Sequence, residues 1–230
     1  MDADKLAMII LLAPGAILAI ALHEAMHGYA ANRFGDPTAK LLGRLTLNPF
    51  KHIDPIGTII VPAFLFYFGG FLFGWAKPVP VNLLNLGQPK RDMAFVAGAG
   101  PAANLLLAFI ASGLLYLLGP LLNLGFSERV MNTVFVPLII MLVLMLRFNI
   151  MLMLFNLIPV PPLDGGRIMT SVLPQKASEW YASIEPFGMF IIIGLLMMDS
   201  YIPLFSKTLF PVMKFFLSFM MPGYIATMGV

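Results

Sequence analysis

Five consecutive residues near the N-terminus have the types and spacing that can hold a metal ion. His23-Glu24-Ala25-Met26-His27 is an H-E-x-x-H sequence. On a helix, positions i and i+4 lie on one face, so both imidazoles can bind one zinc ion while Glu24 reaches a water molecule beside it. A chance match, or two histidines packed in a helix, is the alternative. Ionisable groups are costly at the end of an apolar stretch and mark functional sites there, so metal binding is the favoured interpretation.

Two histidines do not complete such a site, because a catalytic zinc ion has three protein ligands and one open position. The chain has no cysteine, which leaves His, Asp or Glu for the third ligand. The candidates are His52, in NPFKHIDP, and Asp164, in NLIPVPPLDGGR. Asp-Gly-Gly is also a good turn. However, the prolines before Asp164 interrupt a helix at membrane depth, where irregular backbone must be buried or line a wet cavity.

The composition is that of a membrane protein. Hydrophobic residues make up 60% of the 230 positions and charged residues 11%, compared with about 45–50% and about 25% in soluble domains. No linker or repeat divides the chain, so residues 1–230 are expected to form a single membrane-embedded domain. The net charge of +3 comes from basic residues spread over several loops, which does not favour a nucleic-acid-binding surface.

Six apolar stretches approach the roughly 20 residues that a spanning helix requires. We therefore predict an all-α, multi-spanning membrane protein with five to six membrane segments. The stretches are Leu6–Ala31, Ile56–Trp75, Phe95–Leu122, Val134–Ile158, Pro186–Met198 and Leu209–Met221. The last two are short, which is compatible with tilted, joined or interfacial helices.

Loop charges orient these segments. Basic residues gather in loops 32–55 and 76–94 and in the loop after the fourth span, whereas the loop before it holds only Arg129. The positive-inside rule places the basic loops in the cytoplasm. The first and fourth spans then both run toward the cytoplasm. This puts the histidine pair and Asp164 at a similar depth inside the cytoplasmic leaflet, which favours Asp164 over His52.

The same orientation affects residues 56–75. Both loops that flank residues 56–75 lie on the cytoplasmic side, and Pro62 and the Gly69-Gly70 pair interrupt this stretch. A re-entrant hairpin is therefore favoured over a kinked span. Residues Ala39–Leu47 are predicted to form one or two short strands near the cytoplasmic face.

The chain resembles the site-2 proteases, which are zinc intramembrane metalloproteases. The similarity covers about Ala21 to Arg167 and rests on HEAMH (23–27), NPFKHIDPIGT (48–58), GWAKPVPVN (74–82), AGPAAN (99–104) and NLIPVPPLDGG (156–166). H-E-x-x-H alone occurs in many soluble proteases, but the five motifs in this order are specific. Some members carry peptide-binding or nucleotide-sensing domains, for which this chain has no room, so it resembles a minimal form.

The resemblance implies roles for individual residues. His23, His27 and Asp164 match the zinc ligands, with one zinc ion per chain, and Glu24 matches the general base. Asn156 matches a residue that assists the transition state. Asn104 matches the asparagine of the Gly-Pro-x-x-Asn motif, for which helix–helix hydrogen bonding is the favoured interpretation. His52 and Arg147, which lies midway along the fourth span, receive no role.

These expectations combine into one function. We expect a zinc-dependent intramembrane endopeptidase that hydrolyses a peptide bond within or near the transmembrane segment of a membrane-protein substrate. It would be a multi-pass protein of the cell membrane, with its active site toward the cytoplasm and without a nucleic-acid partner. A zinc-binding transporter or pseudoenzyme is the alternative. A transporter needs polar ligands at more than one depth, and a pseudoenzyme would lack Glu24, so proteolysis is favoured.

Overall fold

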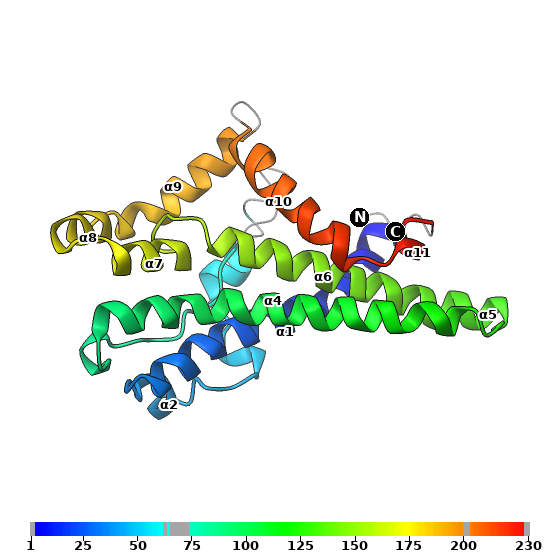
Figure 1. Ribbon diagram of the computed structural model, residues 1–230, viewed down its shortest axis with the longest axis horizontal. Helices are drawn as coiled ribbons and strands as arrows, with labels where there is room; N and C mark the ends of the chain where they lie inside the picture. Colours follow the sequence, from blue (N-terminus) through cyan, green and yellow to red (C-terminus); the bar gives the residue numbers. More distant parts are fainter. Residues whose placement is uncertain (1–2, 62–63, 65–73, 200–202, 228–230) are drawn as a thin grey trace.

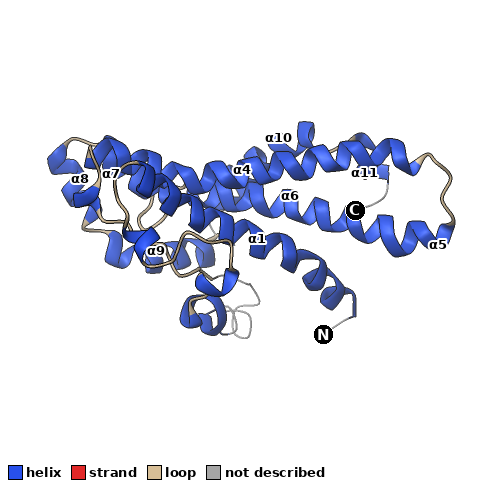
Figure 2. Ribbon diagram, turned by 90° about the horizontal axis from the view of Figure 1, so that it is seen from below, coloured by secondary structure: helices blue, strands red, loops and turns tan. Residues whose placement is uncertain are grey.

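The computed structural model describes residues 3–61, 64, 74–199 and 203–227. In this part of the chain all regular elements are helical, and Figure 2 shows no strand. The elements are α1 (Ala3–Arg33), α2 (Thr38–Leu41), η1 (Pro49–Lys51), η2 (Pro55–Ile60), η3 (Leu83–Asn85), α4 (Pro89–Leu122), α5 (Glu128–Val130), η4 (Met131–Phe135), α6 (Val136–Asn156), α7 (Asp164–Val172), α8 (Gln175–Ala182), α9 (Glu185–Met198), α10 (Leu204–Met220) and α11 (Gly223–Thr227).

Helices α1, α4 and α6 form the body of the molecule (Figure 1). Within the described residues, three helical stretches are long and apolar enough to cross a membrane, namely Leu6–Arg33, Pro89–Leu122 and Glu128–Asn156. α4 alone has 34 residues, so at about 1.5 Å per residue it exceeds the roughly 30 Å hydrocarbon core of a bilayer. The long apolar helices are those of a multi-pass membrane protein.

The main core lies between α4 and α6. The buried face of α4 carries many small residues, including Ala97, Gly100, Ala108 and Ala111. Small side chains allow helix backbones to approach closely, which matters in lipid because the hydrophobic effect does not drive helices together there. Larger side chains of α6, such as Ile150, share one cluster with Ala108 and Ala111, and α10 and α11 extend it.

The chain returns to the same end of the bundle between α1 and α4. The Gly87 N–H donates to the Phe34 carbonyl over 3.1 Å, and the rings of Phe34 and Phe95 stack with centroids 5.6 Å apart. Asp36, buried just after α1, accepts a 2.6 Å hydrogen bond from the Asn82 N–H. The end of α1 therefore lies beside the start of α4, and the two helices run antiparallel.

The predicted number of five to six membrane segments is not confirmed. α9 has 14 residues, or about 21 Å, and joins α8 at a bend of 64°, so this pair counts at most as one broken span or re-entrant loop. α10 has 17 residues and contains Pro211 and two lysines. It is therefore too short, and too polar on one face, to count as a membrane-spanning helix. By length and composition the described residues therefore hold three helices that could span a membrane, or four with the bent pair.

The predicted strand region at residues 39–47 is helix and loop instead. Thr38–Leu41 forms α2, and Gly43, with a φ of +63°, turns the chain out of it. The Arg44 guanidinium then donates to the carbonyls of Lys51, Lys77 and Pro78. A side chain thus holds these loop segments together, in place of a strand ladder.

Most of the predicted hairpin over residues 56–75 lies outside the described residues, but its two ends are described. The Trp75 N–H donates to the Gly57 carbonyl over 3.0 Å, and the Thr58 hydroxyl donates to the Trp75 carbonyl over 3.0 Å. The two ends of this segment therefore lie next to each other. A re-entrant hairpin requires this closeness, and the hairpin itself stays a prediction.

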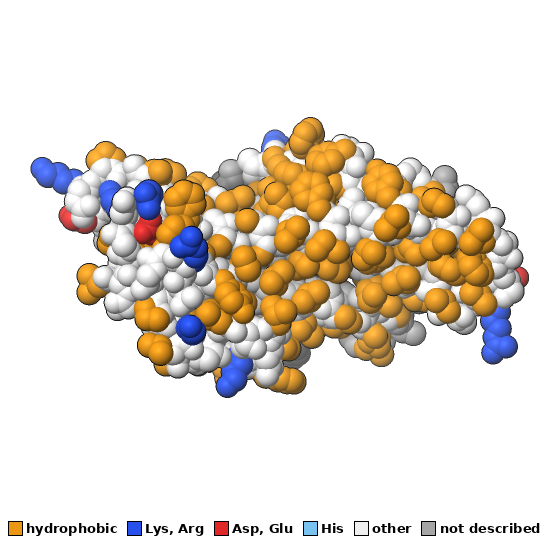
Figure 3. Space-filling view, turned by 60° about the horizontal axis from the view of Figure 1, so that its bottom comes forward, with side chains coloured by type: hydrophobic (Ala, Val, Ile, Leu, Met, Phe, Trp, Pro, Cys, Tyr) orange, Lys and Arg blue, Asp and Glu red, His pale blue; other side chains and the backbone are white. Residues whose placement is uncertain are grey.

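Charge is distributed unevenly over the surface (Figure 3). Hydrophobic side chains cover the length of the bundle in this view, whereas most Lys and Arg side chains gather toward the end where α4 begins and α7 and α8 lie. This pattern suits a body embedded in lipid with one basic end in water.

Candidate metal centre

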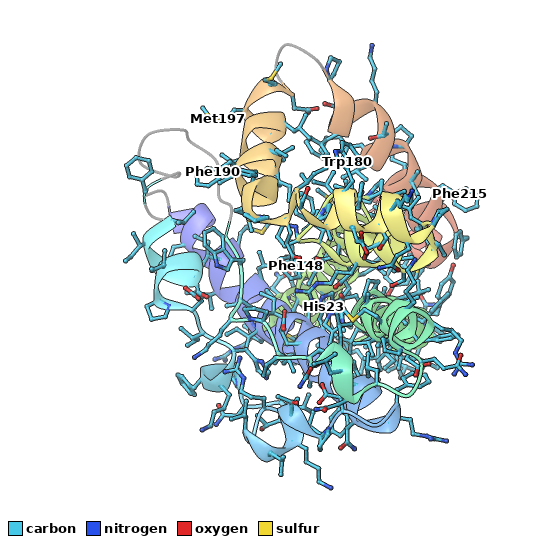
Figure 4. The ribbon with its side chains drawn as sticks, turned by 90° about the vertical axis from the view of Figure 1, so that its left-hand side faces the viewer. His23, Phe148, Trp180, Phe190, Met197 and Phe215 are labelled. Carbon is cyan, nitrogen blue, oxygen red and sulfur yellow. The ribbon has the colours of Figure 1, made fainter. Side chains whose placement is uncertain are left out.

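α1 presents two histidines on one face. His23 and His27 lie one helical turn apart, with 5% and 6% of their surfaces exposed. Their rings meet edge to face, with centroids 4.7 Å apart and planes at 86°. The two Nε2 atoms are 3.1 Å apart, so both nitrogens point at one small space between α1, α4 and α7. Figure 4, viewed from the basic end, shows His23 enclosed among the helices.

Asp164 completes the cluster from the N-terminus of α7. One carboxylate oxygen lies 3.2 Å from His23 Nε2 and the other 3.4 Å from His27 Nε2. The proline-rich loop between α6 and α7 directs the side chain there. Gly165 and Gly166 pack so closely on the backbone of this loop that neither position has room for a Cβ. A broken helix thereby brings a buried carboxylate to two buried imidazoles.

The donor set fits a divalent cation. Among the described residues, the ligand atoms of His23, His27 and Asp164 form a metal-binding cluster, all within 4.8 Å of one another. The buried Oδ2 of Asp164 receives no hydrogen bond from the described residues. Two imidazoles and a carboxylate with one coordination position left open match the ligand number of a catalytic zinc site. The residues present therefore fit zinc.

α4 leaves space for the cluster at Gly100. A Cβ at this position would overlap His27 Nε2 and lie 2.6 Å from His23 Cε1. No side chain other than hydrogen fits between α4 and the two rings. Gly100 thus belongs to the centre although it offers no ligand atom.

Glu24 lies half-buried beside the cluster and has a backbone partner. Its Oε2 accepts a 2.9 Å hydrogen bond from the N–H of Val79, which comes from the irregular segment before α4. A charge-assisted bond of this kind fixes the orientation of the carboxylate. The segment that carries Val79 is therefore part of the site.

Comparison with known proteins assigns the family. Residues 11–198 match the model of peptidase family M50. The chain is 37% identical to "Putative zinc metalloprotease YwhC" of Bacillus subtilis over 198 residues, which cover 86% of this chain and 83% of the relative. It is 27% identical to "Putative zinc metalloprotease Rip2" of Mycolicibacterium smegmatis over 221 residues, which cover 96% and 78%. No solved structure matches the chain.

The chain belongs to peptidase family M50. This is the site-2 protease family that the sequence motifs indicated. The match includes all three residues of the cluster as well as Glu24, Val79 and Gly100.

The remaining predicted residues of this M50 peptidase lie outside the His–His–Asp cluster. Asn156, the last residue of α6, is half-buried, and its amide donates to the Leu152 carbonyl of its own helix over 3.0 Å. His52 is buried, with Nε2 2.9 Å from the Thr46 carbonyl. Arg147 is half-buried on α6. Asn104 contacts His23 directly, with 2.6 Å between its Oδ1 and Nδ1.

A cavity of about 520 Å³ lies next to the centre. Its lining includes Val79, whose N–H holds Glu24, and Gly166, which follows Asp164 closely in the chain. Arg167, Thr170 and Ser178 give another part of its wall a polar character. The cavity thus borders two segments that also carry or support residues of the M50 centre, while His23, His27 and Asp164 themselves do not line it.

The sequence motifs contain Gly100 and Val79 without indicating what they do. Gly100 is the glycine of AGPAAN, so its position was visible but its closeness to the imidazoles was not. Val79 contributes only a backbone N–H, and no residue type signals that contribution.

Proposed function

We propose that this chain is a zinc-dependent intramembrane endopeptidase, which cleaves a transmembrane protein substrate within or near its membrane-spanning segment. The observation that carries the proposal is the buried His23–His27–Asp164 cluster with Glu24 fixed beside it on a long apolar helix. Family membership and the names of the relatives support a zinc metalloprotease.

In this proposal His23, His27 and Asp164 hold one zinc ion. Zinc, when bound, supplies Lewis acidity, which lowers the pKa of water and polarises a carbonyl group. The chain contributes an enclosed space, since all three ligand candidates are buried. Such an enclosure strengthens electrostatic interactions with the reacting groups.

Glu24 is proposed as the general base. The Val79 N–H anchors one carboxylate oxygen, so the other can take a proton from the attacking water and later deliver it to the leaving amine. Asn156 is proposed to help stabilise the oxyanion that develops on the scissile carbonyl. That role requires its amide to leave the present bond to Leu152.

Hydrolysis needs water, which the lipid core lacks. We propose that water reaches the centre from the cytoplasm through the cavity beside Gly166 and Arg167. The basic end of the bundle, where this cavity lies, would then face the cytoplasm of a multi-pass protein in the cell membrane. Residues 1–230 are proposed to form one membrane-embedded domain.

A substrate must present its peptide bond in an unwound form, because a helix hides its backbone in hydrogen bonds. Substrates with Gly, Pro or Asn near the cut unwind most easily. The proposed partners are therefore a transmembrane substrate of this kind and the lipid bilayer.

A zinc transporter fits the structure less well. In the described residues one His–Asp cluster can hold a metal ion, and segment 62–73 contains no His, Asp or Glu. A transport route would need ligands at several depths.

The test combines zinc analysis with cleavage of a model transmembrane substrate by the purified protein. Wild type should hold one zinc ion per chain and cleave. Glu24→Gln should keep zinc but lose cleavage by at least about a hundredfold, since it removes the base. Asp164→Ala should lose both. Glu24→Gln with wild-type cleavage would contradict the proposal, and wild type without zinc would overturn it.

A further inference from the structure

A line of buried amides connects the metal centre to α6. His23 Nδ1 lies 2.6 Å from Asn104 Oδ1, and Asn104 Nδ2 donates to Asn149 Oδ1 over 3.0 Å. Asn149 Nδ2 in turn donates to the Met145 carbonyl over 2.8 Å. Both asparagines are fully buried, with 0% of their surface exposed. Three spanning helices thus meet in one polar line that ends at a candidate zinc ligand.

Two backbone carbonyls fix the direction of this line. Asn104 Nδ2 also lies 3.3 Å from the Ala19 carbonyl, and a carbonyl oxygen can only accept a hydrogen bond. The NH2 group of Asn104 must therefore face Ala19 and Asn149, and its oxygen must face His23. The Met145 carbonyl orients Asn149 in the same way. The reverse orientation of either amide would set two oxygens against each other in a buried space, which is costly.

The fixed direction determines the tautomer of His23. Because the oxygen of Asn104 only accepts, Nδ1 of His23 must carry the proton. In the neutral imidazole Nε2 is then bare, and it is the nitrogen that faces His27 and Asp164. For His27 the backbone sets the same proton position, because its Nδ1 lies 2.7 Å from the Val96 carbonyl. The asparagine side chains thus hold the proton of His23 on Nδ1, as a main-chain carbonyl holds that of His27.

We propose that Asn149, acting through Asn104, is a positioning residue that keeps His23 in the metal-binding tautomer. The inference rests on the proposed zinc site and deepens it. Metal-binding histidines generally donate their other ring N–H to a partner that sets tautomer and orientation, and loss of such partners costs about 10–100-fold in metal affinity. Here the partner is itself held by a residue on a third helix.

The competing explanation is that the two asparagines only join helices. A matched control is available, because Ser112 is also buried on α4 and donates across helices to the Met220 carbonyl over 2.6 Å. Ser112→Ala removes a buried interhelical bond on the same helix without touching His23. If substitutions of Asn149 have an effect that Ser112→Ala lacks, the effect is specific to the hydrogen bonds that join Asn149, Asn104 and His23.

The first measurement is zinc affinity by competition with a chelator on purified, folded protein. Asn104→Leu should weaken affinity by about 10–100-fold, and Asn149→Leu by roughly threefold to tenfold, since it acts one bond further away. The double variant Asn104→Leu/Asn149→Leu should be no weaker than Asn104→Leu alone, because Asn149 acts through Asn104. Asn149→Ala replaces Asn149→Leu if the larger side chain prevents folding.

The second measurement is the tautomer itself, by 15N NMR of histidine-labelled protein without metal. The chain has three histidines, so the spectrum holds few imidazoles. In wild type, His23 and His27 should carry the proton on Nδ1. Asn104→Leu and Asn149→Leu should shift His23 toward a mixture of tautomers and leave His27 unchanged, whereas Ser112→Ala should shift neither.

The outcomes separate this inference from the proposed function. Wild-type zinc affinity and an unchanged His23 tautomer in the Asn149 variants would overturn the inference while the zinc site stands. Equal losses in Ser112→Ala would also overturn it. If wild type binds no zinc, the proposed function fails, and the tautomer measurement still decides whether Asn149 controls His23.

Discussion

At the scale of single residues, the centre depends on a glycine as much as on the ligand candidates. Two imidazole nitrogens and a carboxylate lie within 4.8 Å of one another, and α4 passes directly over them at Gly100. Because packed helices leave little free volume, a small addition at this position must displace the rings or the helix.

Substitution of Gly100 tests this closeness. Gly100→Ala should weaken zinc binding by at least about tenfold, because the new Cβ would overlap His27 Nε2. Gly98→Ala is the matched control, since it lies on the same helix and its Cβ would meet nothing within 4 Å. Zinc affinity by chelator competition gives the readout. Equal affinity in the two variants would show that α4 does not confine the rings.

Residue types and local spacing predicted part of this centre but not all of it. The four-residue spacing of His23 and His27 follows from helix geometry, and the motif around Asp164 identified the third member of the cluster. The partner of Glu24 is 55 residues away in the chain and acts through its backbone. Asn149 is 45 residues from Asn104 and lies in an apolar run that resembles any other. Contacts of this kind exist only once the helices have packed.

At the scale of elements, the segment between α1 and α4 is held by buried polar groups. Asp36 accepts hydrogen bonds from the Thr38 N–H, the Asn82 N–H and the Asn85 amide. The sequence of residues 39–47 suggested one or two short strands. It could not show that Asp36 and Arg44 would bind the loop backbone and leave no ladder to form.

The charge of Asp36 should make stability depend on pH. Burial alone would raise its pKa, but hydrogen bonds from Thr38, Asn85 and Asn82 outweigh burial and hold the pKa of Asp36 below its usual range. A carboxyl with a lowered folded-state pKa stabilises the fold above its unfolded pKa of about 3.9, and this contribution is lost as pH falls through the folded value.

Asp36→Asn should therefore lower the free energy of unfolding at pH 7 by about 1–3 kcal/mol. The difference in the free energy of unfolding between variant and wild type should narrow as the pH falls below about 4. Thermal unfolding in detergent at several pH values measures it. Glu128→Gln, at an exposed position on α5, is the control and should change nothing. A gap that stays constant down to pH 2 would show that the ionised form is not what stabilises the loop.

A second element-scale contact supports the loop that carries Asp164. α9 meets this loop at Gly188, where a Cβ would overlap the Pro161 carbonyl oxygen. The Tyr181 hydroxyl of α8 also donates to the Pro159 carbonyl. The bent pair α8–α9 therefore packs against and supports the loop that follows α6.

Gly188→Ala should push α9 from the loop and reduce zinc affinity and cleavage together, by roughly threefold to thirtyfold, through displacement of Asp164. Gly194→Ala on the same helix should be silent, because its Cβ would meet nothing within 4 Å. Chelator competition and substrate cleavage are measured in parallel. Loss of cleavage with unchanged zinc affinity would mean that α9 serves the substrate and not the metal ligand.

At the scale of the whole molecule, length and charge determine which helices cross the bilayer. α1, α4 and the α5–α6 stretch are long enough to span. α9 could do so at most together with α8, across a bend of 64°, and α10 is shorter and carries two lysines. The count of five to six segments is not confirmed in the described residues, because counting apolar residues does not register where a helix bends or ends. The basic end, by contrast, follows from the loop charges directly, and it lies where α1 ends and α4 begins (Figure 3).

The proposed orientation can be tested at the two ends of α4, because the chain has no cysteine of its own. Gln88 precedes α4 and Asn123 follows it, and both are exposed. A membrane-impermeant maleimide applied to spheroplasts should label Asn123→Cys at once, and Gln88→Cys only after permeabilisation, because the positive-inside rule holds the basic end in the cytoplasm. The cysteine-free parent is the control and should stay unlabelled. The reverse pattern would place the metal centre near the outer face, and labelling of both ends from outside would mean that α4 does not cross the membrane.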